Sequence, residues 1–188
     1  MVLRPVRPED ARELSLLSRR SDMQEFQEIP MLTQGELAAR IARRPRRLDA
    51  RATGRFEWLM YLIDGFDHPM GWVSLRIFDR IRNCGEIGYS VVGDFRGRGL
   101  ATEATAGLVD ASFVHGSLDR IEARCTEENV ASRGVLERLG FERIASVPVA
   151  TIVHGRRVSL LQFAMDAVNW RKAQIFEGYR PRHRSSRA

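Results

Sequence analysis

The residues of this chain that could do chemistry gather around a loop of glycines and arginines near its centre. The loop reads Arg96-Gly97-Arg98-Gly99-Leu100-Ala101. Glycine has no β-carbon, so the backbone at Gly97 and Gly99 can approach a ligand closely. The pattern after the loop predicts a helix from Leu100, whose first N–H groups and positive dipole end favour an anion. The two guanidinium groups would add charge-assisted hydrogen bonds. The sequence therefore predicts a phosphate site here.

Three kinds of phosphate-binding loop can be compared with this one. A Walker loop ends in Gly-Lys-Ser/Thr, and no lysine is present here. A Rossmann fingerprint needs a third glycine where Thr102 stands, and its first glycine would lie too far beyond the strand. The third pattern, Arg-x-x-Gly-x-Ala from Arg96 to Ala101, resembles the pyrophosphate-binding motif of the GNAT N-acetyltransferase superfamily. An ordinary glycine turn is the alternative.

The segments on either side of the loop add to this resemblance. Glu86-Ile87-Gly88-Tyr89 before it and Ala101-Thr102-Glu103-Ala104 after it look like the RimJ/RimL-like branch, the ribosomal-protein N-acetyltransferases. Asn129-Val130-Ala131-Ser132, leading to Leu139-Gly140-Phe141, is similar to the second coenzyme motif of that branch. The specific motifs lie within residues 84–141, and residues 1–168 can be laid over the family. The resemblance implies acetyl-coenzyme A (acetyl-CoA) as the acetyl donor.

Glu86 is the candidate general base. It lies in an otherwise apolar strand, where partial burial would raise the pKa of its carboxyl group towards the range useful for a base. In the family that this chain resembles, a glutamate on this strand often takes the proton from the amine, sometimes through a water. The alternative is a salt bridge with one of the many arginines, which would give Glu86 a structural role.

Several further residues are expected to contact the coenzyme because of the resemblance. The family's central strand splays from its neighbour, which would free backbone N–H groups at Val91 and Val92 for the thioester and pantetheine arm. Ser132 could protonate the departing thiolate, or it could be an ordinary serine in a first helical turn. Asn129 could bind the pantetheine arm or cap the helix. The predicted coenzyme-binding residues are Val91, Val92, Arg96, Gly97, Arg98, Gly99, Leu100, Ala101, Thr102, Asn129 and Ser132.

The elements around the loop can be predicted from hydrophobic periodicity. The apolar run 87–92 predicts a buried strand, and apolar residues three or four apart from Leu100 to Val114 predict a helix. A second strand at 121–125 must then run parallel to the first, because a helix joins them. A short helix at 129–139 follows. The final strands are expected at 141–149 and 158–165, with a turn at His154-Gly155 between them.

The N-terminal half should supply the rest of the sheet and two helices. Apolar and polar residues alternate over residues 2–7, which predicts an edge strand. The helix after it should bury Leu14 and Leu17, with Leu16 as a third candidate. Residues 21–32 have weak periodicity. Thr33 and Glu36 form a capping-box pattern that predicts a second helix. Strands at 56–63 and 70–78, with a turn at 65–69, should form an antiparallel hairpin.

Composition and charge favour a single domain with a basic tail. The chain has 188 residues and is 44% hydrophobic, which suffices for one core. We expect a domain over residues 1–168 and a tail over 169–188. Residues 171–188 carry net +5 of the formal +6, so the body is nearly neutral and nucleic acid is an improbable partner. The loop at 43–55 is also arginine-rich and could be either a solvated loop or an anion-binding patch.

Other features of the sequence bear on membrane insertion, disulfide bonds and metal binding. The sequence has no run of eighteen apolar residues and no signal-peptide pattern at its start. Cys84 and Cys125 should lie at opposite ends of neighbouring strands and cannot bridge, which favours a reduced, cytoplasmic setting. The histidines show no ligand spacing, so no metal is expected. A homodimer is left open.

These observations together predict an α/β fold of the GNAT type. Its single mixed sheet would be mostly antiparallel, with a splayed parallel central pair, and flanked by helices. The expected activity is acetyl transfer from acetyl-CoA to a primary amine by direct attack. The amine could belong to a protein N-terminus or to a small molecule such as an antibiotic or a polyamine. The alternative is a non-catalytic module that binds acyl-CoA.

Overall fold

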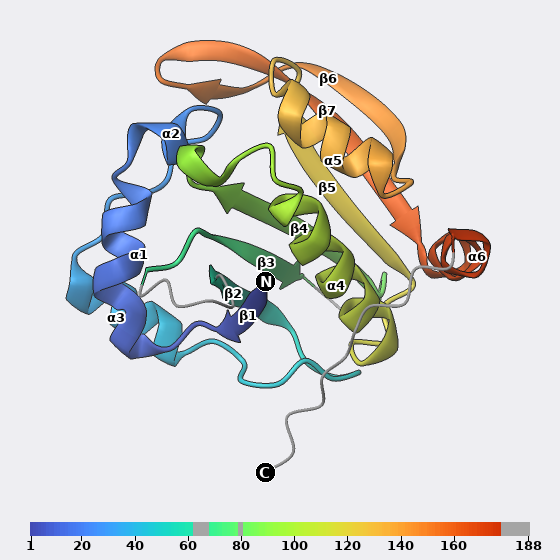
Figure 1. The fold of residues 1–188 in the computed structure, drawn as a ribbon, viewed down its shortest axis with the longest axis horizontal. Coiled ribbons are helices and arrows are strands. Elements are labelled where there is room, and N and C mark those ends of the chain that lie inside the picture. The colour runs from blue at the N-terminus through green and yellow to red at the C-terminus, as the bar shows by residue number, and fades with distance from the viewer. Residues whose placement is uncertain (62–67, 79–80, 178–188) are drawn as a thin grey trace.

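The computed structural model describes residues 1–61, 68–78 and 81–177, with side chains described up to residue 172. Within these ranges, seven strands form one sheet in the order β1-β2-β3-β4-β5-β7-β6, in which only β4 and β5 are parallel (Figure 1). The strands are β1 (Val2–Pro5), β2 (Gly54–Tyr61), β3 (Gly71–Ile77), β4 (Cys84–Val91), β5 (Arg120–Thr126), β6 (Glu142–Val153) and β7 (Arg156–Asp166). The predicted mixed sheet, with β1 at one edge, is confirmed.

The helices lie on both sides of this sheet. They are α1 (Ala11–Ser18), α2 (Ser21–Gln24), α3 (Gln34–Ala42), α4 (Leu100–Val114), α5 (Val130–Arg138) and α6 (Ala167–Glu177). Figure 1 shows α4 and α5 across one face, with α1 and α3 grouped beside β1 to β3. No helix in the described part of the chain is long and apolar enough to span a membrane.

Two hydrophobic clusters hold these layers together. The larger one lies between α4 and the sheet, where Leu100, Ala104 and Leu108 meet β3 and β4 residues such as Leu75 and Ile87. The smaller one joins α1, α2 and α3 to the other face. Because side chains alternate along a strand, Trp72 on β3 belongs to this second cluster while its neighbour Val73 belongs to the first.

Two apolar residues that were expected in the core are exposed. Leu16 is 53% exposed, whereas Leu14 and Leu17 are buried, because Leu16 lies on the opposite side of α1 from that pair. Val114 is 62% exposed because α4 ends there. Of the other predicted positions, Leu100, Ala104 and Leu108 are buried and Ala111 is half-buried; Ala106, Val109 and Phe113, off the predicted face, are buried as well.

The expected boundary between domain and tail falls inside a helix. β7 ends at Asp166 and α6 follows directly, so residues 169–177 are helical and not an extension without structure. Trp170 is buried in the main core, and its indole N–H donates to Asp110 at 3.5 Å. The folded part therefore continues past residue 168. Residues 178–188 of the expected tail, and 62–67 around the expected hairpin turn, lie outside the described residues.

The capping box predicted for α3 is present. The Thr33 hydroxyl accepts from the Glu36 N–H at 3.2 Å, and the Glu36 carboxylate accepts from the Thr33 N–H at 2.9 Å. These bonds satisfy N–H groups that would otherwise lack partners at the start of the helix. They also fix where the chain leaves the 21–32 segment.

Replacing Thr33 with alanine should destabilise the fold modestly. Loss of an N-cap side chain costs about 1 kcal/mol, which in a protein of this size corresponds to a fall of about 2–4 °C in melting temperature. Thermal unfolding of Thr33→Ala, with Thr53→Ala in an exposed loop as the matched control, measures this. Equal melting temperatures for the two variants would contradict a stabilising cap.

Candidate active site

The two central strands pair only at their beginning. The parallel ladder joins β4 residues 84–87 to β5 residues 120–123 and goes no further. β4 then continues to Val91 along β3, and β5 continues to Thr126 along β7. Since each strand stays paired with its outer neighbour, the two diverge from each other. The splayed parallel pair implied by the resemblance is therefore present.

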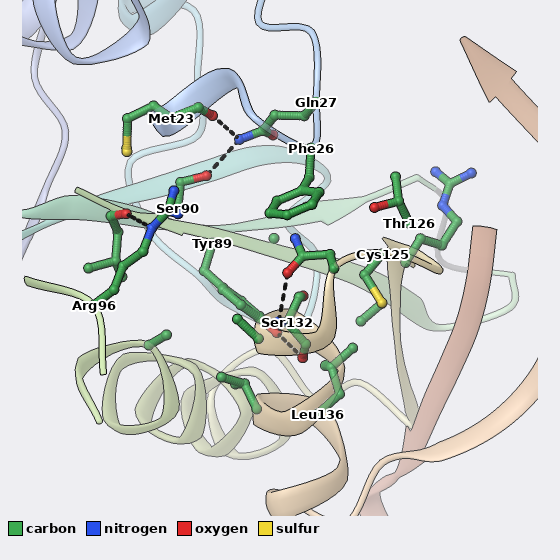
Figure 2. Close-up of a pocket in the computed structure, with 18 of the residues that line it drawn as sticks. Met23, Phe26, Gln27, Tyr89, Ser90, Arg96, Cys125, Thr126, Ser132 and Leu136 are labelled. Carbon is green, nitrogen blue, oxygen red and sulfur yellow. Dashed lines mark hydrogen bonds between the residues drawn. The ribbon is translucent and has the colours of Figure 1, made fainter. Parts of the chain in front are cut away.

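A cavity of about 730 Å³ lies at this opening (Figure 2). Tyr89 and Cys125 line it from the sheet face covered by α4 and α5, and they pack with the main core. Ser90 and Thr126, next to them in sequence, line it from the opposite face because strand side chains alternate. The cavity thus connects the two faces of the sheet through the gap between β4 and β5.

The glycine loop forms one end of the cavity. A 3-10 turn, η2 (Gly93–Phe95), leads into it from β4. Gly97 and Gly99 have φ of 75° and 78°, a left-handed conformation that favours glycine. A β-carbon added at either position would meet no heavy atom within 4 Å, so the space above the loop is open. Gly99 caps α4, and the first helical residues, Leu100, Ala101 and Thr102, line the cavity.

Arg96 lines the cavity, but its guanidinium group is held by the protein. Its Nε donates to the Val91 carbonyl at 3.1 Å, and Nη1 meets the Glu25 carboxylate at 2.7 Å. Nη2 donates to the Asp22 carbonyl. The side chain therefore ties the loop to β4 and to the α2 region. This use differs from the direct contact with an anion that the sequence suggested.

Two other predicted coenzyme contacts lie outside the cavity wall. Arg98 stacks over the Phe95 ring, with 5.4 Å from its guanidinium carbon to the ring centre, and donates to the Asp94 carbonyl. The N–H of Val92 donates to the Met70 carbonyl at 2.8 Å, so it is not free for a thioester. Val92 itself packs with α1 and α3. The expectation that its N–H is unpaired is wrong.

Ser132 is held at the cavity by two neighbours. The Asn129 side chain caps α5 by accepting from the Ser132 N–H at 2.9 Å, which is the capping role that the sequence left open for Asn129. The Tyr89 hydroxyl lies 3.0 Å from the Ser132 hydroxyl and 3.0 Å from the Ser132 carbonyl (Figure 2). Burial raises the pKa of Tyr89, so its hydroxyl stays protonated at neutral pH. It can therefore donate to one Ser132 oxygen.

Glu86 does not line the cavity. Its carboxylate meets Arg124 at 2.7 Å and Arg76 at 3.5 Å, which is the salt bridge left open by the sequence. By strand alternation it points to the face away from α4, together with Gly88 and Ser90. Arg124 does line the cavity. The carboxylate is therefore one side chain away from the opening.

The wall formed by residues 22–28 had almost no signal in the sequence. Phe26 and Gln27 line the cavity, and the Gln27 amide donates to the Ser90 hydroxyl at 2.7 Å (Figure 2). The tip of the β6–β7 hairpin closes over this wall, since the His154 N–H donates to the Glu28 carboxylate at 2.8 Å. Both contacts join residues far apart in the chain, and no local sequence pattern predicts them.

Thr126 and Cys125 also line the cavity, and the sequence assigned neither of them a role. The Thr126 hydroxyl is buried and, within the described structure, has no hydrogen-bond partner. An unpaired buried hydroxyl is costly. Burial raises the pKa of the Cys125 thiol, with the Ser132 hydroxyl opposing that shift. Both cysteines are free, as expected.

Two solved acetyltransferases illustrate the shared fold. The ribosomal-protein-S5-alanine acetyltransferase from Vibrio fischeri superposes with a TM-score of 0.78 at 19% identity, covering 89% of this chain and 93% of that one. A point mutant of the spermidine N-acetyltransferase SpeG from Vibrio cholerae superposes with a TM-score of 0.75 at 17% identity, covering 90% and 97%. At these identities the likeness concerns the fold alone.

Relatives found by sequence are also named as N-acetyltransferases. The protein named "Putative ribosomal N-acetyltransferase YdaF" from Bacillus subtilis is 29% identical over 100 residues, 53% of this chain and 55% of its own length. The uncharacterized N-acetyltransferase p20 of Bacillus licheniformis is 26% identical over 117 residues, 62% of this chain and 66% of that protein. The matches thus span about half to two thirds of these relatives. The pattern of the acetyltransferase (GNAT) domain matches residues 1–142, so the chain belongs to the GNAT acetyltransferase family.

Proposed function

We propose that this protein transfers an acetyl group from acetyl-CoA to a primary amine by direct attack. The observation that carries the proposal is the cavity that passes through the gap between β4 and β5. A coenzyme held by the glycine loop on one side and an amine entering from the other face would meet in that gap. Holding both reactants in one orientation supplies much of the rate enhancement.

The residues around the cavity fit the coenzyme. The N–H groups after Gly99 and the open space above both loop glycines suit a pyrophosphate. Arg96 holds this loop in place through its hydrogen bonds to the Val91 carbonyl and the Glu25 carboxylate, so we assign it a positioning role.

The reaction needs one bond formed, one broken and two proton movements. The amine nitrogen attacks the thioester carbonyl carbon, and backbone N–H groups of the splayed strands would stabilise the oxyanion. The C–S bond then breaks, and the sulfur leaves as a thiolate that takes a proton from Ser132 while Ser132 regains one from water. The proton of the amine goes to Glu86, which we place one water away because the carboxylate lies outside the cavity wall.

An acceptor screen tests this function. We expect the protein to consume labelled acetyl-CoA in the presence of one class within a panel of N-terminal peptides, polyamines and aminoglycosides. Acetyl-CoA should also raise the melting temperature. Coenzyme binding without transfer to any amine would favour the non-catalytic acyl-CoA module instead, and absence of binding would exclude both functions.

Tyr89 and Ser132 should act as one unit in this reaction. Ser132→Ala should lower kcat about tenfold, less than the usual 10²–10⁴ of acid–base catalysis, since water can also protonate a thiolate. Tyr89→Phe should lower kcat by no more than that, because it removes only the hydroxyl that holds Ser132. The double variant should be no worse than Ser132→Ala alone.

Tyr61→Phe is the matched control, because the Tyr61 hydroxyl contacts Arg4 far from the cavity. Steady-state kinetics on all four variants measures the coupling. Additive losses in the double variant would contradict a shared role for Tyr89 and Ser132.

A further inference from the structure

A second cavity, of about 490 Å³, opens on the sheet face away from α4. It lies between α1, α3, residues 27–32 and strands β2 and β3, in the region where Figure 1 shows α1 and α3 grouped. Trp72 and Leu37 supply apolar walls, and three arginines, Arg40, Arg44 and Arg55, line it as well. Apolar walls with a few charged groups are typical of sites that orient a ligand.

Three arginines and two glutamates, Glu57 and Glu28, line this second cavity. The buried carboxylate of Glu57 is bonded to Arg44 and, at 2.9 Å, to Arg55. Two guanidinium groups thus share one carboxylate, and each has further N–H donors in its planar fork. Arg40 adds a third positive charge; the exposed Glu36, one turn earlier in α3, acts on it electrostatically but does not line the cavity. The lining thus has a net positive charge, which favours an anionic group near the three arginines.

The second cavity adjoins the candidate active site. Gln27 and Glu28 line both cavities. Trp72 of the second cavity is the direct cross-strand partner of Ser90, which lines the first. Side chains of such partners lie about 5 Å apart. The gap between β4 and β5 thus lies one residue pair away from Trp72, with the Gln27–Ser90 hydrogen bond between the two cavities.

We propose that this second cavity binds an acidic side chain of a peptide whose N-terminal amine enters the gap. The inference rests on the proposed acetyl transfer and selects the acceptor class. The amine would pass Glu28, whose carboxylate suits a cation, and an Asp or Glu a few residues further on would meet the arginines. A polyamine would bring a second positive charge to the same three guanidinium groups, and they disfavour it.

Arg40 is the residue to change in a test. Arg44 and Arg55 hold the buried Glu57, and removing either would weaken the pairing of that buried charge and threaten the fold. Arg40 is exposed, so Arg40→Glu reverses a charge of the cavity without that risk. Arg47→Glu is the matched control, because Arg47 is also exposed and lines neither of the two cavities.

The experiment compares peptides that are identical except for Asp or Lys at positions 2 to 4. Binding is measured by fluorescence anisotropy of C-terminally labelled peptides with CoA present, and kcat/KM is measured with acetyl-CoA. A charge-assisted contact predicts about a tenfold preference for the Asp peptide. Arg40→Glu should abolish or invert it, and Arg47→Glu should preserve it. The preference should also weaken as salt is added.

Several results would overturn the inference. They are equal binding of both peptides, tighter binding of the Lys peptide or of spermidine, no peptide binding at all, or an equal loss from Arg40→Glu and Arg47→Glu. Its failure is distinct from failure of the proposed function. Acetylation of peptides without an acidic preference would contradict only the inference. Selective binding of acidic peptides without acetylation would support the inference and contradict the function.

Discussion

Exchanging Glu86 for glutamine should lower turnover by about 10²–10⁴-fold at neutral pH and leave coenzyme affinity nearly unchanged. Glutamine keeps the shape of the side chain but cannot accept the proton of the amine. The bonds to Arg124 and Arg76 weaken as well, but neither arginine holds the glycine loop. Steady-state kinetics on the acceptor found by the screen, together with coenzyme titration, measures both quantities.

The pH dependence separates a lost base from a damaged fold. Activity of Glu86→Gln should rise towards wild type at high pH, because more of the amine is already deprotonated there. Glu122→Gln is the matched control, since Glu122 faces Glu86 across the parallel ladder and pairs with Arg120. Normal turnover in Glu86→Gln would eliminate Glu86 as the base. A larger loss in Ser132→Ala would mean that thiolate departure limits the rate.

The framework of the site could be predicted from sequence because its signals are local. The apolar run of β4, the two glycines and the three-to-four spacing of α4 specify strand, turn and helix without reference to the rest of the chain. The parallel pairing of β5 follows from the helix between the strands. The capping box at Thr33 depends on residues only three apart. Each of these elements is present where it was expected.

The direction of individual side chains could not be predicted in the same way. Arg96 turns from the loop because Asp22 and Glu25, more than seventy residues earlier, supply its partners. The N–H of Val92 donates to the Met70 carbonyl and is therefore not available to a ligand. Residues 21–32 have almost no periodicity, yet three of them, Gln24, Gln27 and Glu28, make the long-range bonds to Ser90 and His154. Such contacts depend on tertiary packing. The acceptor side of the site could therefore be predicted least well from the sequence.

Backbone contacts with the pyrophosphate should make Gly99 the most sensitive position for coenzyme binding. At a hundredfold excess over its dissociation constant, acetyl-CoA should stabilise the wild-type fold by about 2.7 kcal/mol, or roughly 5–10 °C in melting temperature. Gly99→Glu should abolish this shift, because its carboxylate would project into the open space above the loop and meet the phosphates.

The matched control for that change is Gly99→Gln, which has the same size and the same backbone demand without the charge. Both variants place a side chain at φ 78°, so both should lose about 1 kcal/mol of stability without ligand. The difference between their coenzyme-induced shifts then reports electrostatic repulsion alone, and it should shrink at high salt. Gly99→Gln should keep part of the wild-type shift while Gly99→Glu keeps none. A full shift in Gly99→Glu would mean that the phosphates bind elsewhere, and that the glycine loop does not hold the coenzyme.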